Sequence, residues 1–246
     1  MPAAENTGII FIRADIKGRP KIKASLENVK STSRGTNLSN GGAAVCTVEH
    51  ILSALYALSI TNLEIELDSE ELPALDGSSK PYCDLLISSG VARQKQNTKT
   101  IEIKEPVIAM DGGKCIIGLP SNRFAAGFMI NYPVNFIGTQ FFGIDISPEG
   151  YLKDIAQART YGFIDELETL KNKGLAAGAT KDNAVAIGKE GYLSELRYGD
   201  ELVRHKVLDM IGDISLAGAQ IKGRIIGIRA GHELNIKFAK MLKEVG

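Results

Sequence analysis

The sequence predicts an α+β fold, in which sheets pack on helices in layers, divided into two domains of similar size. In both parts of the chain, segments with apolar residues at helical spacing occur together with short segments typical of strands. A polar and basic stretch, residues 91–100, separates the two parts, and a solvated linker explains it better than a phosphate-binding patch. We therefore expect an N-terminal domain at residues 1–95 and a C-terminal domain at residues 96–246.

The N-terminal part contains two predicted strands, residues 8–13 and 62–67, and two predicted helices. The first helix spans residues 47–58, where apolar side chains recur at helical spacing. The second helix, residues 81–87, ends before Gly90. Each of these elements has one apolar face available for a core.

The C-terminal part is predicted to contain several strands and then several helices. The strands span residues 100–108, 114–119, 124–131 and 222–229. The helices span residues 148–158, 165–172, 201–216 and 233–243, with Gly174 and Gly218 as C-terminal caps of the second and third. Each part thus holds strands and at least two helices, as layered α+β domains require.

Composition excludes several classes of protein. The 246 residues carry 29 basic and 29 acidic side chains, so no net charge attracts nucleic acid or an acidic membrane. No Gly-x-Gly-x-x-Gly motif follows a strand, no apolar run could span a bilayer, and the first residues lack the apolar core of a signal peptide. Three widely spaced cysteines form neither a disulfide framework nor a thiolate zinc site, and they fit a reducing cytoplasm.

The predicted helix at residues 201–216 carries the most informative chemical pattern. His205 and Asp209 are four residues apart, which places an imidazole and a carboxylate side by side on one helical face. Asp213 extends the stripe by one more turn. Because such pairs also arise by chance, the spacing alone is compatible with a metal site or with an ordinary surface pair.

The other two of the three histidines also lie in polar settings: His50 follows Glu49, and His232 follows Gly231. Two histidines and an aspartate suit a divalent metal that keeps one position for water. If His50 binds a metal, Glu49 diverges from it by about a third of a turn and can reach that water to accept its proton. The alternative for Glu49 is a solvated residue in the first turn of a helix.

Asp213 lies too far along its helix to share an ion easily with His205. It could instead hold His232 by a hydrogen bond, and its negative charge would favour the imidazolium form that a general acid needs. The alternative for Asp213 is a carboxylate on the surface of the helix.

The chain resembles the bacterial zinc-dependent UDP-3-O-acyl-N-acetylglucosamine deacetylases of lipid A biosynthesis. The resemblance runs from about residue 6 to the C-terminus. It rests on five segments: TVEHILSAL (47–55), ELPALDGSS (71–79), ARTYGF (158–163), LRYGDELVRHKVLDMIGD (196–213) and AGHELN (230–235). By this resemblance, the two domains have a similar layered design, each a β-sheet packed on α-helices, and the metal site lies in a cleft between them.

The resemblance also implies the cofactor and its ligands. His50, His205 and Asp209 would bind Zn²⁺, although Fe²⁺ also accepts two imidazoles and a carboxylate. Glu49 would be the general base and His232 the general acid.

Three further residues receive roles from the same resemblance. Asp213 would orient and charge His232, and Thr160 would help stabilise the oxyanion. Lys206 would contact the polar head or the phosphates of the substrate, a UDP-linked acylated amino sugar. The family further implies an apolar tunnel for the acyl chain.

Two differences separate this sequence from the family pattern. Family members begin with a strand and a turn containing glycine and histidine ahead of the point where this chain starts, so we expect an exposed sheet edge here. The second difference is GATKDN at residues 178–183, which has Ala179, Thr180 and Lys181 where the family usually has glycine, serine and an apolar residue. That loop lies near the acyl-chain passage in the family.

The sequence therefore predicts a cytoplasmic, metal-dependent amidase that removes the N-acetyl group of the UDP-linked sugar and releases acetate. A hydrolase of another amide, such as a different N-acetyl sugar, would use the same ligands without an acyl tunnel. A binding protein that has lost turnover would not require Glu49, His232 and Asp213 together. No feature of the sequence indicates an oligomeric state.

Overall fold

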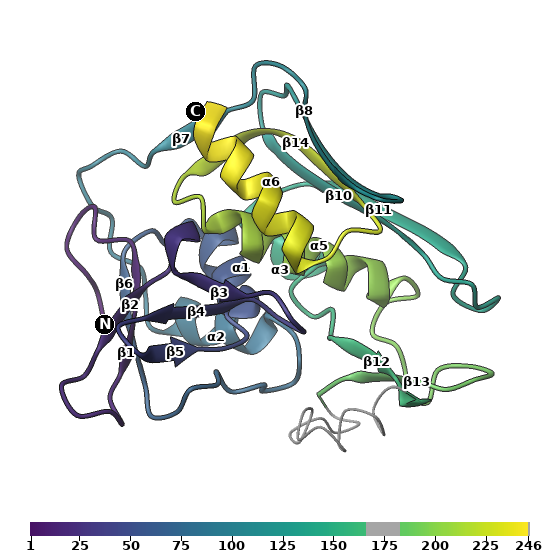
Figure 1. The fold of residues 1–246 in the computed structure, drawn as a ribbon, viewed down its shortest axis with the longest axis horizontal. Helices are drawn as coiled ribbons and strands as arrows, with labels where there is room; N and C mark the ends of the chain where they lie inside the picture. The colour runs from purple at the N-terminus through teal and green to yellow at the C-terminus, as the bar shows by residue number, and fades with distance from the viewer. Residues whose placement is uncertain (166–182, 246) are drawn as a thin grey trace.

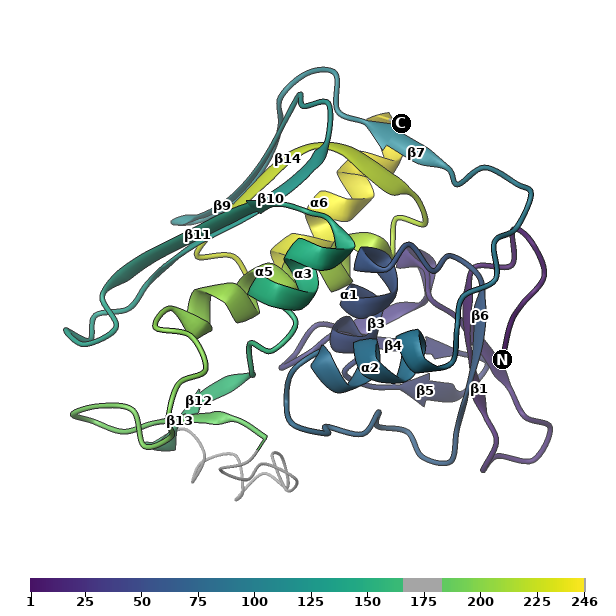
Figure 2. The same ribbon diagram turned by 180° about the vertical axis from the view of Figure 1, so that it is seen from behind.

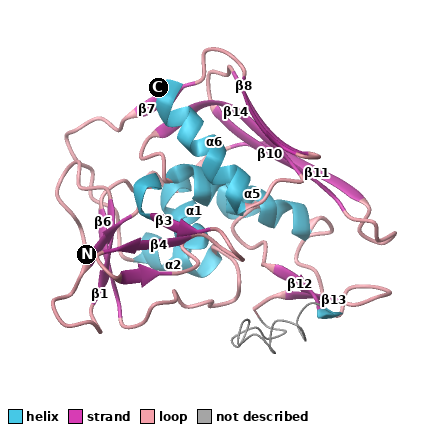
Figure 3. Cartoon of the chain, viewed as in Figure 1, coloured by secondary structure: helices cyan, strands magenta, loops and turns pink. Residues whose placement is uncertain are grey.

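The structure is a computed structural model that describes residues 1–165 and 183–245 (Figure 1). It confirms the predicted α+β class, with helices gathered at the centre and strands around them (Figure 3). The described α-helices are α1 (Glu49–Ala57), α2 (Lys80–Ser88), α3 (Pro148–Asp154), α5 (Glu201–Ser215) and α6 (His232–Val245). None of them is long and apolar enough to cross a membrane.

The largest sheet lies in the C-terminal part. Its strand order is β11-β10-β14-β9-β8, and β7 pairs with the start of β14. β14 is parallel to β10 and antiparallel to β9. The strands are β7 (Thr100–Glu102), β8 (Val107–Asp111), β9 (Lys114–Leu119), β10 (Phe124–Asn131), β11 (Thr139–Asp145) and β14 (Gln220–Ile228).

Three smaller sheets complete the described strands, with the orders β2-β1-β6, β3-β4-β5 and β12-β13. A 3-10 turn, η1 (Leu26–Asn28), precedes β3. The strands are β1 (Ile9–Arg13), β2 (Lys21–Lys23), β3 (Val29–Ser31), β4 (Asn37–Asn40), β5 (Ala43–Val45), β6 (Leu63–Leu67), β12 (Tyr161–Phe163) and β13 (Val185–Ile187).

The two parts of the chain repeat one topology. β1 pairs antiparallel with β2 and parallel with β6, and α1 precedes β6. β10 likewise pairs antiparallel with β11 and parallel with β14, and α5 precedes β14. The two parts differ at the second edge of the parallel strand. In the C-terminal part, β9 pairs with the second edge of β14. In the N-terminal part, the second edge of β6 pairs, among the described residues, only with Met1 and Pro2, where Glu64 N donates to Met1 O at 2.9 Å.

Helices α1 and α5 pack against each other at the centre of the molecule, between the large sheet and the smaller sheets (Figure 1). All nine residues of α1 are buried, since α5 and α2 both contact it; the view from behind shows α2 beside it (Figure 2). A helix surrounded in this way is held by its packing rather than by its intrinsic propensity. The side chains on the facing surfaces of α1 and α5 therefore have fixed positions.

Several predicted boundaries are wrong for identifiable reasons. The strand predicted at residues 100–108 is two strands, β7 and β8, because Pro106 lies between them and has no backbone N–H for a ladder. α1 begins at Glu49 rather than at residue 47 because Thr47 has a left-handed φ of 60°.

The helix predicted at residues 148–158 ends at Asp154, where Ile155 leaves the helical conformation and both Ile155 N and Ala156 N bond to Tyr151 O. Sequence patterns also missed β2 to β5 and β11 to β13. The predicted helix beyond Asp165, its cap Gly174 and loop residues 178–182 lie outside the described residues.

Candidate active site

The facing surfaces of α1 and α5 bring three predicted site residues together. His205 Nε2 lies 3.2 Å from Asp209 Oδ1, and His50 Nε2 lies 3.8 Å from the same oxygen. One nitrogen from each imidazole and one carboxylate oxygen are all within 4.8 Å of one another, and the three residues are buried. The imidazole rings are nearly perpendicular, with centroids 5.0 Å apart.

The protonation states of this cluster suit a cation. Burial lowers the pKa of His50 and lowers that of His205 to about 4, so both rings are neutral at pH 7. Burial opposes ionisation of Asp209, but the surrounding imidazoles and Lys206 lower the pKa of this carboxyl below its usual value. Asp209 Oδ1 is buried and has no hydrogen-bond partner among the described residues. Two neutral nitrogens and an unpaired carboxylate oxygen are a donor set for a divalent metal.

The ring of His205 is oriented by the backbone. Its Nδ1 lies 3.1 Å from the carbonyl oxygen of Ala158, which can only accept a hydrogen bond. The neutral ring therefore carries its proton on Nδ1 and leaves the lone pair of Nε2 directed at Asp209 and the cluster. This is the tautomer that a metal-binding histidine needs.

The Glu49 carboxylate lies beside the cluster at the start of α1. Its Oε2 accepts a hydrogen bond from Thr36 N at 2.9 Å, and its Oε1 lies 3.9 Å from His232 Nε2. Burial raises the pKa of this carboxyl to about 7. A carboxyl that changes protonation near neutral pH is suited to proton transfer.

His232 begins α6 and contacts the last of the predicted carboxylates. Its Nδ1 donates to Asp213 Oδ2 at 2.8 Å, and Asn235 Nδ2 donates to the same oxygen at 2.8 Å. The other oxygen of Asp213 accepts from Thr36 Oγ1 at 2.5 Å. Burial lowers the pKa of His232, but the carboxylates of Asp213, Asp209 and Glu49, with Asp213 foremost, together raise that pKa to about 10. The ring is therefore cationic at pH 7.

The structure also gives the positions of Thr160 and Lys206. Thr160 N donates to Gly77 O at 2.9 Å, which ties the start of β12 to the N-terminal part. Lys206 Nζ donates to Asp209 Oδ2 at 2.7 Å and lies 5.5 Å from the centroid of the Tyr161 ring. The ammonium group is thus directed into the cluster. No hydrogen bond links the Thr160 side chain to the cluster among the described residues.

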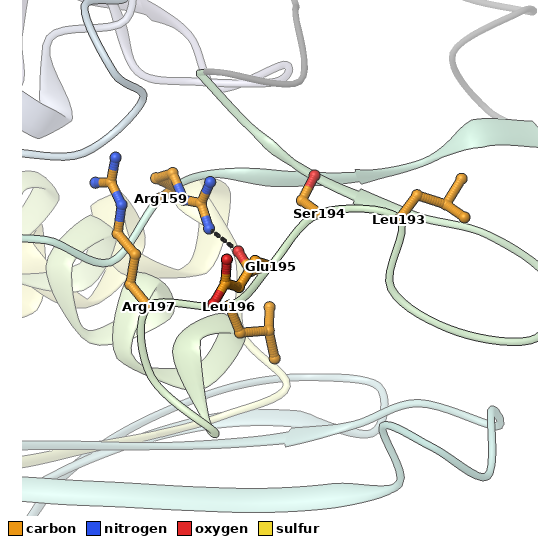
Figure 4. A pocket seen from close by; sticks show the side chains of 6 residues that line it. All are labelled: Arg159, Leu193, Ser194, Glu195, Leu196 and Arg197. Carbon is orange, nitrogen blue, oxygen red and sulfur yellow. Dashed lines mark hydrogen bonds between the residues drawn. The ribbon is translucent and has the colours of Figure 1, made fainter.

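A buried ion pair fixes the segment before β12 to α5. Arg159 Nε donates to Glu201 Oε1 at 2.9 Å, and Arg159 Nη2 donates to Glu195 O at 2.6 Å (Figure 4). Glu201 precedes His205 by one helical turn, so the pair also sets the distance of Thr160 from the cluster. A cavity of about 410 Å³ lies at this ion pair; its lining residues are Arg159, Leu193, Ser194, Glu195, Leu196 and Arg197, none of which belongs to the cluster.

Sequence reasoning missed four residues that the fold brings to this site. Asn235 is three residues after His232, a helical spacing that places both on one face, and the pattern could have indicated it. Thr36 is 177 residues from Asp213, and no local pattern connects them. Tyr132 directly follows β10 and Tyr161 begins β12, and their hydroxyl oxygens are 2.8 Å apart.

Comparison with known proteins places the chain among the deacetylases, because residues 1–244 match the LpxC family, described as UDP-3-O-acyl N-acetylglycosamine deacetylase. The chain therefore belongs to the UDP-3-O-acyl N-acetylglycosamine deacetylase family.

Individual relatives carry a closely similar name, UDP-3-O-acyl-N-acetylglucosamine deacetylase. The protein from Syntrophotalea carbinolica is 41% identical over 243 residues, which are 98% of this chain and 79% of the relative. The proteins from Geobacter sp. (strain M21) and Syntrophus aciditrophicus are 37% and 38% identical, covering 98% and 99% of this chain and 80% and 78% of the relatives.

Proposed function

We propose that this protein hydrolyses the N-acetyl group of UDP-3-O-acyl-N-acetylglucosamine, releasing acetate, as a step of lipid A biosynthesis in the cytoplasm. Membership of the deacetylase family supports the substrate. The observation that carries the reaction type is the buried set of His50, His205 and Asp209 beside a carboxylate and a cationic imidazole.

The cofactor in this proposal is Zn²⁺, held by His50, His205 and Asp209, with Fe²⁺ as the alternative that the same donors accept. When bound, such an ion lowers the pKa of a water molecule and polarises the acetamide carbonyl. The unpartnered Asp209 Oδ1 and the Nε2 atoms of the two neutral imidazoles supply the ligand atoms.

The residues of the chain carry the proton transfers. Glu49 accepts the proton of the attacking water through Oε1, because Thr36 occupies Oε2. His232 donates a proton to the leaving amine from Nε2, since its Nδ1 is bound to Asp213. Glu49 Oε1 and His232 Nε2 are 3.9 Å apart, so the attacking water and the leaving amine of one acetamide group can lie within reach of both residues.

Thr160 and Lys206 complete the proposed machinery. Thr160 donates to the oxyanion of the tetrahedral intermediate. The Lys206 ammonium, which donates to Asp209 Oδ2, would contact the polar head of the substrate. The site lies between α1 and α5, so we place it between an N-terminal domain of residues 1–95 and a C-terminal domain of residues 96–246.

Acetate release from UDP-3-O-acyl-N-acetylglucosamine tests the function directly. Activity should disappear after chelation and return with added zinc. The matched comparison is UDP-N-acetylglucosamine without the acyl chain, on which a hydrolase of other N-acetyl sugars would act equally well. Equal turnover of the two substrates, or activity that survives complete metal removal, would contradict the proposal.

A further inference from the structure

We propose that Thr36 is a positioning residue that holds the two proton-transfer groups, Glu49 and His232, in a fixed relative geometry. This inference rests on the proposed deacetylase function. Thr36 lies in the loop between β3 and β4, far in sequence from both groups, and its side chain is completely buried.

Thr36 contacts two carboxylates of the site at once, those of Glu49 and Asp213. Its backbone N–H donates to Glu49 Oε2 at 2.9 Å, and its hydroxyl donates to Asp213 Oδ1 at 2.5 Å. Asp213 in turn accepts from His232 Nδ1. A continuous chain of hydrogen bonds to charged groups, which are short and strong, therefore runs from Glu49 through Thr36 and Asp213 to His232.

The loop that carries Thr36 is shaped to leave the second oxygen of Glu49 free. Gly35 has a φ of 153°, and a Cβ at that position would lie 2.9 Å from Glu49 Oε1. Thr36 O also accepts from Val48 N at 3.1 Å, which joins the loop to the residue before α1. Oε2 is thus held by Thr36 N, and the lack of a side chain at position 35 avoids a clash with Oε1.

The Thr36 hydroxyl holds one oxygen of Asp213 in the same way as the Thr36 N–H holds one oxygen of Glu49. Because Oδ1 is occupied by Thr36, the carboxylate plane is fixed with Oδ2 facing His232 and Asn235. Without the hydroxyl, a buried carboxylate oxygen loses its donor and the group reorients toward another one. His232 would then move relative to Glu49, and proton transfer would suffer although the substrate and metal contacts remain.

Thr36→Val and Thr36→Ser separate this role from a general packing role. Valine keeps the shape and the backbone N–H but removes the hydroxyl, whereas serine keeps both donors. We expect kcat of Thr36→Val to fall about 100-fold, as for a misplacement of roughly 1 Å. KM and zinc content should stay at the wild-type level, and Thr36→Ser should retain most of the activity.

Ser53→Ala provides the matched control. Ser53 is a fully buried hydroxyl on α1, and it accepts a hydrogen bond from Tyr151 OH at 2.7 Å outside this network. If Thr36 affects activity only by stabilising the fold, the Ser53→Ala and Thr36→Val proteins should lose similar activity when their melting temperatures fall by a similar amount. We expect only Thr36→Val to lose kcat.

A second readout does not depend on turnover. With three histidines in the chain, the ring N–H of His232 can be assigned in zinc-loaded, ¹⁵N-histidine-labelled protein. Its resonance should shift in Thr36→Val and stay in place in Thr36→Ser. The inference is overturned if the His232 resonance of Thr36→Val does not move. It is also overturned if the wild-type protein is active and Thr36→Val has the same kcat. A wild-type protein that releases no acetate refutes the proposed function instead, while the resonance still tests Thr36.

Discussion

A methyl group on Gly212 would lie 2.1 Å from the carbonyl oxygen of Glu49. The backbone of α1 thus passes directly over Gly212, and no side chain could separate the two helices there. This contact sets the distance between the residues at the start of α1 and those on α5. Glycine at position 212 is therefore a condition for the cluster of His50, His205 and Asp209.

Gly212→Ala should destabilise the protein and disrupt the cluster. Because the clash is with backbone, α1 must move, and we expect a loss of about 3 kcal/mol in the free energy of unfolding. Urea denaturation measures this loss, and zinc content should fall with it. Gly191→Ala is the control, since a Cβ there meets nothing within 4 Å. Equal midpoints for the two variants would contradict this account of Gly212.

The second prediction concerns the metal. His205→Ala and Asp209→Ala should each reduce metal content and activity together, because each removes one of three ligand atoms. Metal analysis of the purified variants measures this. Asp200→Ala is a matched control, as this carboxylate precedes the same helix but bonds to Arg204. Full zinc occupancy in both ligand variants would show that the ion binds elsewhere.

The sequence predicted the parts of the site that lie within one element. His205, Asp209 and Asp213 share a helix, so their spacing alone placed them on one face. The position of His50 next to Asp209 depends on how α1 crosses α5. Its residue type and its place after Glu49 suggested a ligand, and the resemblance to a family assigned it to this set. The role of Thr36 could not be predicted from the sequence, because its partners Glu49 and Asp213 are 13 and 177 residues away and only the fold brings them together.

The fold was predicted where elements are long and regular. β9 and β10 have the predicted bounds because both are mainly apolar segments, and Gly113 and Pro120 mark the turns on either side of β9. β2, β3 and β5 have three residues each, too few for a period to be recognised. In β11 no residue is fully buried, and polar residues at both ends leave only a short apolar segment. The repeated topology of the two parts was also hidden, because pairing between strands depends on partners distant in sequence.

The third prediction concerns Glu49→Gln. The amide keeps the shape of the side chain and an oxygen for Thr36 N, but it cannot accept a proton. We expect kcat to fall at least about 100-fold with little change in KM, as for removal of a general base. Zinc content serves as the control and should remain at the wild-type level. A near-normal kcat would exclude Glu49 as the base.

The last prediction concerns pH. Burial raises the pKa of Glu49 to about 7, and this group must be deprotonated to act as the base. Although burial opposes it, Asp213, with Asp209 and Glu49, raises the pKa of His232 to about 10, and this group must be protonated to act as the acid. Activity should therefore rise with pH through the pKa of Glu49 and fall as His232 loses its proton, which gives a bell-shaped profile. A cation bound at the cluster would move the acidic limb below pH 7, since positive charge favours the carboxylate.

Asp213→Asn tests which group produces the basic limb. The substitution removes the negative charge that lies nearest to His232. Two other carboxylate oxygens remain near His232 Nε2: Glu49 Oε1 at 3.9 Å and Asp209 Oδ2 at 4.0 Å. The pKa of His232 should fall by about 1–3 units, the effect of one adjacent charge, so the basic limb moves to lower pH. The acidic limb should shift less and also to lower pH, since Asp213 is a secondary cause of the raised pKa of Glu49, after burial. His232→Ala should abolish the limb together with most of the rate. A basic limb that stays in place in Asp213→Asn would mean that this pair, despite its 2.8 Å contact, does not set the protonation of the acid.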